Sequence, residues 1–200
     1  MNPETETFLR HLQSQRKFEA AASLAMGSEH LGAILTEAVL LPGSRYKSQV
    51  RPRIERLLQE YPEGKTTGIF VGLIEEISPK YFFNWEENDK PRRVLAAAKH
   101  LHELGVETAD DFRLLFDEPD FAKFLKEIRG VGAKHIDDLR QLLGLPCDTR
   151  EESVRIILEE AGLSFQTWKE AGRMLEEASI EIDLPLDHLL LCLWRYVNYR

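Results

Sequence analysis

Two glycines, Gly130 and Gly132, separate two stretches of helical pattern within residues 121–144, and this feature constrains the chain most strongly. Apolar residues recur at helical spacing on both sides of the glycines, for example at Ile128 and Leu139. Glycine permits a tight turn with positive φ and lets a ligand approach the backbone closely. The helix that follows begins with unpaired N–H groups and the positive end of its dipole. The segment therefore predicts a helical hairpin that can hold a phosphate, and an ordinary hairpin whose glycines only satisfy turn geometry is the alternative.

The hairpin Gly130-Val131-Gly132-Ala133-Lys134 and the later segment Leu143–Thr149 resemble the helix-hairpin-helix DNA glycosylase superfamily. That superfamily includes endonuclease III and the 8-oxoguanine glycosylases. In its bifunctional members a lysine two residues after the second hairpin glycine is the nucleophile, and this position matches Lys134. The aspartate that follows the hairpin in the family matches Asp148. The resemblance implies a base-excision repair DNA glycosylase, bifunctional, with AP-lyase activity through a lysine Schiff base.

The resemblance also implies an architecture. The expected fold is all-α, a single glycosylase-like domain over residues 1–200 with two helical lobes and a DNA groove between them. We expect a central lobe over residues 28–116 and a second lobe made of residues 1–27 plus 117–200, which would contain the hairpin. Lobes in this family are commonly discontinuous, with both chain ends in one lobe.

Hydrophobic periodicity independently predicts a helical chain. Thr108 and Ser164 are typical helix N-caps, while Gly105 and Gly162 follow apolar-periodic segments as helix stops. The one strand-like run, Gly68–Ile74, continues with helical spacing and is predicted to be a helix. The expected helices lie near residues 4–24, 28–40, 46–60, 67–77, 90–104, 108–116, 119–129, 133–143, 151–161, 165–178 and 186–197.

The chemistry of base removal assigns roles to the two matched residues. The nucleotide must first be flipped out of the duplex so that the deoxyribose C1′ becomes accessible. A deprotonated Lys134 could then attack C1′, while a carboxylate from Asp148 stabilises the charge that develops on the sugar. A solvated lysine and a simple N-cap aspartate are the respective alternatives. Asp137 and Asp138 are local substitutes for the carboxylate.

Further residues are candidates for DNA contact. The hairpin residues expected to bind DNA are Arg129, Gly130, Val131, Gly132, Ala133 and His135, and a separate basic stretch adds Arg45 and Lys47. In the aromatic stretch 81–85, Phe83 and Trp85 are candidates for a base pocket or wedge, and core packing is the alternative. Trp168, Trp194 and Tyr196 are predicted to lie in the core.

The chain departs from the family pattern in three places. Lys134 and Asp148 are fourteen residues apart, several fewer than is usual in the family, so the connection between them is shortened. Arg150 stands where the family has histidine. Ile136 stands where a small residue usually packs the two hairpin helices together.

Charge is distributed unevenly. The chain has 26 basic and 34 acidic residues, a net charge of −8, whereas a duplex binder gains affinity from a basic surface. Residues 43–56 nevertheless carry five bases and one acid, and residues 121–140 carry five bases and three acids. Residues 148–187 hold eleven acids and four bases. The pattern is compatible with one basic face, and ordinary solvated helix faces are the alternative.

Composition excludes several classes of protein. Two cysteines, Cys147 and Cys192, cannot form a disulfide framework or the four-cysteine iron-sulfur cluster of many endonuclease III relatives. The six histidines show no metal-ligand spacing, so no metal and no organic cofactor is expected. No membrane-length apolar run and no apolar leader occur, which predicts a cytoplasmic protein. By the family's habit we expect a monomer.

Two functions of different classes follow. The first is the glycosylase with AP-lyase activity, acting on double-stranded DNA that contains a damaged base or an abasic site. The second is a non-catalytic relative that binds DNA or a protein, keeping the hairpin without the chemistry. The sequence contains no motif that identifies the excised base.

Overall fold

A computed structural model describes residues 2–15, 18, 29–116, 118, 120–121, 125–126, 128, 131–145 and 148–199. Throughout these residues the secondary structure is helical, without a β-strand, which confirms the all-α prediction. The chain forms two compact units. Residues 27–145 make one, here called the interior unit, and residues 1–26 together with 146–200 make the other, the terminal unit.

The unit boundaries differ from the expected lobes. The sequence-based division placed residues 117–145 with the chain ends, whereas the contacts place them in the interior unit. The reason is the packing of α10 (Ala133–Leu142) against α3 (Leu31–Leu40), which lies in that unit. Both chain ends belong to the terminal unit.

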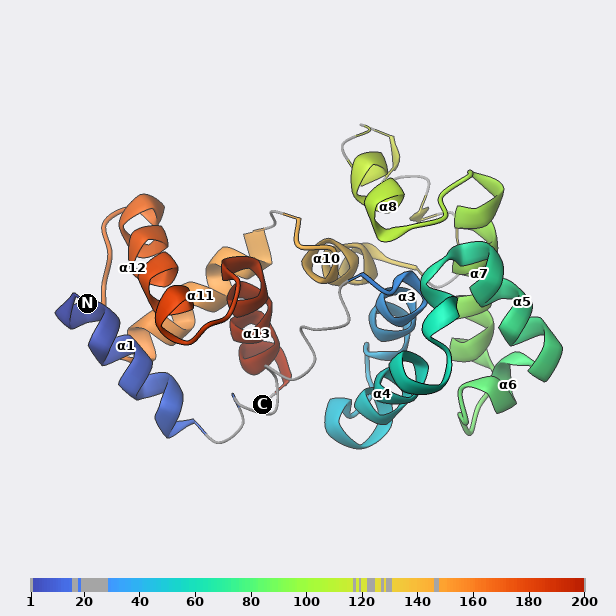
Figure 1. Cartoon of the computed structure of the whole chain (residues 1–200), viewed down its shortest axis with the longest axis horizontal. Helices are drawn as coiled ribbons and strands as arrows, with labels where there is room; N and C mark the ends of the chain where they lie inside the picture. The colour runs from blue at the N-terminus through green and yellow to red at the C-terminus, as the bar shows by residue number, and fades with distance from the viewer. Residues whose placement is uncertain are drawn as a thin grey trace. The chain divides into compact units, whose positions relative to one another are not determined.

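The interior unit is built around α3. Figure 1 shows α3 among α4 (Arg51–Glu60), α7 (Asp89–Glu103) and α10, and α3 contacts all three. All ten residues of α3 are buried, and all but Thr36 and Glu37 are apolar, so apolar residues cover most of the helix surface. Among the described residues of this unit, further helices are α5 (Thr67–Ile77), α6 (Pro79–Phe82) and α8 (Ala109–Phe116), with a π-helical turn at Tyr46–Val50 and a 3₁₀ turn at Pro62–Lys65.

Hydrogen bonds fix the start of α3. His30 is the N-cap, and its Nδ1 accepts from the Ala33 N–H at 3.0 Å. Its Nε2 lies 2.9 Å from the Tyr61 carbonyl oxygen, so the neutral ring donates there and accepts at Nδ1. Within the helix, the Thr36 hydroxyl donates to the Gly32 carbonyl at 2.6 Å, which satisfies a polar group in the core.

Several boundary predictions hold. The run Gly68–Ile74 lies within α5, so the helix prediction is confirmed. Gly105 and Gly162 have φ of +75° and +74° after α7 and α11, which confirms both helix stops. Before α8 the Thr108 hydroxyl accepts from the Asp111 N–H at 3.2 Å, so Thr108 is the predicted cap.

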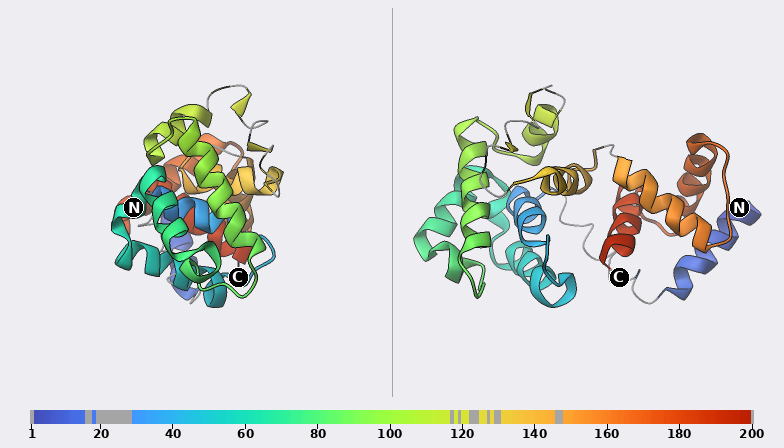
Figure 2. Two further views of the ribbon diagram at one scale, coloured as in Figure 1. Left: turned by 90° about the vertical axis from the view of Figure 1, so that its right-hand side faces the viewer. Right: turned by 180° about the vertical axis from the view of Figure 1, so that it is seen from behind.

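The terminal unit contains α1 (Pro3–Ser14), α11 (Asp148–Glu160), α12 (Trp168–Glu181) and α13 (Leu186–Tyr199). Figures 1 and 2 show α1 beside α12, so the two ends of the chain fold together. The Thr5 hydroxyl donates to Glu177 Oε2 at 2.9 Å, and the Tyr196 hydroxyl donates to Gln15 Oε1 at 2.8 Å.

Two predictions for the terminal unit are wrong. α12 begins at Trp168 after the cap Thr167 and not after Ser164, because the Thr167 side chain accepts from the Glu170 N–H. Trp194 and Tyr196 are buried as predicted, but Trp168 is 42% exposed. Trp168 is the first residue of its helix, where the chain leaves the core.

Gly32 and Gly72 form a matched test of this packing. A Cβ at Gly32 would lie 2.6 Å from the Gly64 carbonyl oxygen and 2.7 Å from the Phe70 ring, whereas a Cβ at Gly72 would meet no atom within 4 Å. Gly32→Ala should lower the free energy of unfolding by about 1–3 kcal/mol because of overpacking. Gly72→Ala should raise it by about 0.5–1 kcal/mol because alanine favours a helix interior. Urea denaturation of both variants checks the opposite signs, and equal effects would contradict the described packing of α3.

Candidate nucleic-acid interface at the N-terminal end of helix α10

An apolar face holds α10 in the interior unit. Ile136, Leu139 and Leu142 recur at helical spacing and are buried, and Val131 before the helix is buried too. Ile136, which stands where the family has a small residue, is buried in a helix that packs against α3. This packing fixes the direction in which the first turn of α10 faces.

Two arginines tie α10 to α8. The Arg113 Nε donates to the Leu143 carbonyl at 2.9 Å, at the C-terminal end of α10, where a cation also complements the helix dipole. Hydrogen bonding to Glu29 raises the pKa of Arg113, and Asp110 adds to that effect, so the guanidinium stays charged. The Arg140 guanidinium lies 5.5 Å from the centre of the Phe116 ring. Two cations thus connect α8 with the C-terminal end of α10.

Gly132 is the N-cap of α10 and does not have the expected positive φ. Its φ is −110° with ψ −176°, an extended conformation that any residue adopts. No atom would lie within 4 Å of a Cβ at this position, and both Gly132 and Ala133 are exposed. The glycine therefore leaves an open surface at the helix end and is not required by the backbone geometry.

Donors at this helix end are partly engaged. The Gly132 N–H donates to His135 Nδ1 at 3.2 Å, so His135 folds back onto the cap. The N–H groups of His135 and Ile136 donate to the Gly132 carbonyl. Ala133 and Lys134 occupy the first two helical positions, whose N–H groups have no acceptor within an α-helix. These two N–H groups are the donors that the helix end presents to a ligand.

For the predicted catalytic residues Lys134 and Asp148, the structure describes the backbone. Lys134 is the second residue of α10 and Asp148 is the first residue of α11. The two positions belong to different units, and the side chains of both lie outside the described part of the structure, as do Arg129 and Gly130. Of the substitute carboxylates, Asp138 is buried and Asp137 is half-buried.

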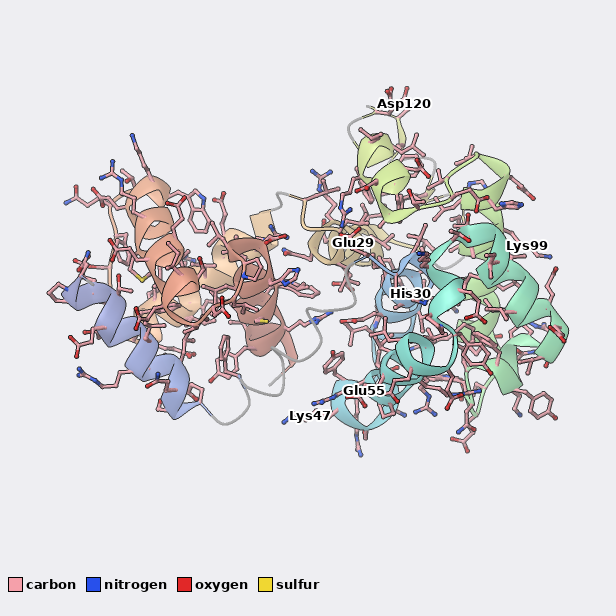
Figure 3. All side chains as sticks on the ribbon, in the orientation of Figure 1. Glu29, His30, Lys47, Glu55, Lys99 and Asp120 are labelled. Carbon is pink, nitrogen blue, oxygen red and sulfur yellow. The ribbon has the colours of Figure 1, made fainter. Side chains whose placement is uncertain are left out.

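The basic stretch 43–56 is largely committed to internal contacts. Arg51 pairs with Glu55, and Arg56 pairs with Glu60. The Arg53 guanidinium donates to the backbone carbonyls of Gln49, Phe83 and Asn84. Arg45 and Lys47 are exposed and form no salt bridge within the described residues, and Figure 3 shows Lys47 extending away from the ribbon. Of the five basic side chains in residues 43–56, the two predicted DNA contacts, Arg45 and Lys47, are therefore the ones not engaged in these internal contacts.

The aromatic stretch divides between core and surface. Phe83 is 1% exposed and packs edge-to-face against Phe70 and Phe82, so the structure places it in the core. Trp85 is half-buried and borders a cavity of about 300 Å³. The Arg53 guanidinium lies 5.1 Å and the Lys90 ammonium 5.7 Å from the centre of the Trp85 ring. Two cations thus hold the one aromatic side chain of the predicted pair that reaches the surface.

Lys90 was not singled out as a site residue, yet it fixes the loop that carries Arg45 and Lys47. Its ammonium donates to the Leu40 carbonyl at 2.9 Å, the Pro42 carbonyl at 2.6 Å and the Ser44 hydroxyl at 2.5 Å. Burial lowers the pKa of Lys90, and nearby Arg93 lowers it further. The sequence shows Lys90 only as a basic residue at the start of α7. Its hydrogen-bond partners lie 46 to 50 residues earlier in the chain, and no local sequence pattern reveals them.

Removal of the Lys90 ammonium should loosen this loop. Lys90→Met keeps the aliphatic stem but leaves two carbonyls and a hydroxyl without their donor, so we expect the free energy of unfolding to fall by about 1–3 kcal/mol. Lys99→Met on the same helix removes only a surface ion pair with Glu75 and should cost less than about 1 kcal/mol. Chemical denaturation of the two variants measures the difference, and equal costs would show that Lys90 does not hold the loop.

The described residues contain no cluster of histidine, cysteine and acidic side chains that could hold a metal ion. Over the same part of the chain no helix is both long and apolar enough to span a bilayer. No model of a known protein family matches the sequence, and no curated protein and no solved structure matches it either.

Proposed function

We propose that this protein binds double-stranded DNA through the N-terminal end of α10 and acts there as a base-excision DNA glycosylase with AP-lyase activity. The observation that carries the proposal is the helix end itself. An exposed glycine cap with open space around it precedes two helical positions whose N–H groups have no acceptor within the helix, and the second of these positions is a lysine.

Phosphate recognition is the first step of the argument. The N–H groups of Ala133 and Lys134 are directed out of the helix end, and the helix dipole adds partial positive charge there. Gly132 in front of them is exposed and adds no side chain of its own, and the His135 ring bonded to its N–H is a further group that can face a phosphate. Since α10 is fixed by α3 and α8, these donors keep one orientation.

Lysine chemistry is the second step. A lysine at the positive end of a helix is disfavoured as an ammonium ion, which favours the nucleophilic amine. The amine of Lys134 would attack C1′, and the damaged base would leave with the bonding electron pair and take up a proton. Opening of the sugar then gives an imine between lysine and C1′. Loss of a C2′ proton expels the 3′ phosphate and cleaves the strand.

Asp148 would supply the carboxylate of this reaction. It opens α11 directly after the short connection 143–147. A carboxylate stabilises positive charge that develops on the sugar, and it can shuttle protons as the base leaves.

Two further observations support DNA binding of this kind. Arg45 and Lys47 are exposed cations of the interior unit, the unit that also contains α10. Both chain ends also belong to one unit, as the resemblance implies, although α10 lies in the other unit and not with the chain ends as expected.

A non-catalytic relative that keeps the hairpin is the second candidate. The observation that favours it is charge: the chain has a net charge of −8, and most cations of residues 51–56 are engaged internally. Such a protein would bind DNA or a protein through the same helix end and perform no chemistry.

Borohydride trapping distinguishes the two candidates. With abasic-site DNA, the wild-type protein should form a covalent adduct that Lys134→Ala abolishes, because the borohydride reduces the Schiff base. Lys65→Ala removes an exposed lysine elsewhere in the interior unit and should trap normally. Asp148→Asn should slow base release from damaged DNA by about 100- to 10,000-fold.

The outcomes separate cleanly. Without an adduct and without strand nicking the lyase assignment is wrong, and a separate assay of base release then tests a monofunctional glycosylase. DNA binding that lacks both activities would establish the non-catalytic candidate.

The salt dependence of DNA binding tests Arg45 and Lys47. Each cation that contacts a phosphate contributes about 1 to the slope of log K against log salt concentration. Arg45→Ala and Lys47→Ala should each reduce that slope by about 1. Arg10→Ala, an exposed arginine on α1 in the terminal unit, should leave it unchanged. Fluorescence anisotropy over a salt series measures the slopes, and an unchanged slope in both variants would remove these residues from the interface.

A further inference from the structure

The terminal unit contains a cavity that the proposed function does not use. It has a volume of about 490 Å³ and lies between α11, the connection 161–167 and the first turn of α12. Volumes of this size are typical of sites for small organic molecules. All of its lining residues belong to the terminal unit.

One wall of the cavity is apolar. It is formed by Leu158, Leu163, Phe165, Ala171 and Trp168, the last being 42% exposed. An exposed tryptophan at the edge of a cavity presents a large apolar ring that has no need of a polar partner on its face. Trp168 was predicted to lie in the core, and it is exposed instead because it lines this cavity.

The connection that closes the cavity is held by hydrogen bonds. The Leu163 N–H donates to the Leu158 carbonyl at 2.8 Å. The Thr167 side chain caps α12, and the Gln166 N–H donates to Glu170 Oε2 at 3.1 Å. The walls are therefore formed before a ligand enters, which lowers the cost of ordering them.

The other wall is anionic. Three carboxylates, Glu151, Glu152 and Glu159, line the cavity with a single base, Arg155. Arg155 forms a bidentate pair with Glu152 at 2.7 Å and a longer pair with Glu159 at 3.6 Å. Glu151 forms no salt bridge within the portion of the chain that the structure describes. The wall as a whole carries two more negative than positive charges.

We propose that this cavity is a binding site for a small organic cation with an aromatic or aliphatic body. The apolar wall accepts the body, the face of Trp168 attracts the cationic group, and Glu151 and Glu159 complement its charge. The acidic surface around it, eleven acids against four bases in residues 148–187, repels phosphates and other anions. The proposal does not depend on DNA binding.

Three probes of nearly equal shape test the charge preference on the full chain. These are 3-phenylpropylammonium, neutral 3-phenylpropanamide and anionic 3-phenylpropanoate, titrated by calorimetry or ligand-observed NMR. The cation should bind about tenfold more tightly than the amide, and the anion should not bind measurably. Equal affinities for cation and amide, or binding of the anion, would overturn the proposal, as would failure of all three probes to bind.

Matched variants locate the site. Trp168→Leu should weaken binding of the cation by about 3- to 30-fold through loss of the cation–π contact. The double change Glu151→Gln and Glu159→Gln should weaken the cation and leave the amide nearly unaffected. Glu176→Gln, at an exposed position of α12 outside the cavity lining, should change neither. Cation binding that survives the first two changes would place the site elsewhere and refute the assignment.

Discussion

The complete burial of α3 is the constraint on which the interior unit depends. A helix surrounded on every side must be largely apolar, and α3 meets this requirement at every residue except Thr36, whose hydroxyl is hydrogen-bonded, and Glu37. Its two ends are specified by distant groups. The His30 ring caps the first turn and reaches the Tyr61 carbonyl, while the Lys90 ammonium donates to the carbonyl of Leu40, the last residue of the helix. α7 and α10 pack against the same helix, so the positions of Lys90 on α7 and of the first turn of α10 depend on it.

The functional proposal depends on what this packing leaves exposed. Packing against α3 uses the apolar side of α10, and the bond from Arg113 engages its C-terminal end. The opposite end is the one presented to a ligand, with Gly132, Ala133 and the backbone of Lys134. The same logic applies to the cations. Within residues 43–56, the arginines whose guanidinium groups bind carbonyls or carboxylates stabilise the fold, whereas Arg45 and Lys47 are exposed.

Local signals in the sequence predicted local structure well. Helical periodicity, the Thr108 cap and the stops at Gly105 and Gly162 depend on residues within a turn or two, and the structure confirms them. The features that the sequence did not reveal depend on distant partners. Lys90 reaches across to the end of α3, and contacts with Phe70 and Phe82 decide between the two alternatives for Phe83 by placing it in the core.

Close alternatives explain the remaining differences. Ser164 and Thr167 are both residue types that cap helices, and the second caps α12, because its hydroxyl accepts from the Glu170 N–H while the Glu170 carboxylate accepts from the Gln166 N–H. Gly132 was expected to have positive φ, but a helix cap needs only an extended backbone. For the proposed DNA-binding site, this means that Gly132 is not required by the backbone conformation, and that its missing side chain leaves space for a ligand.

Amide chemical shifts measure the central claim most directly. In a ¹⁵N-labelled protein titrated with a duplex that contains a stable abasic-site analogue, the amides of Ala133 and Lys134 should show the largest shifts, because their N–H groups would donate to phosphate. The shifts should saturate together and should decrease at high salt. If these two amides stay unperturbed while the duplex binds, or if no amide responds, the N-terminal end of α10 is not the DNA-binding site.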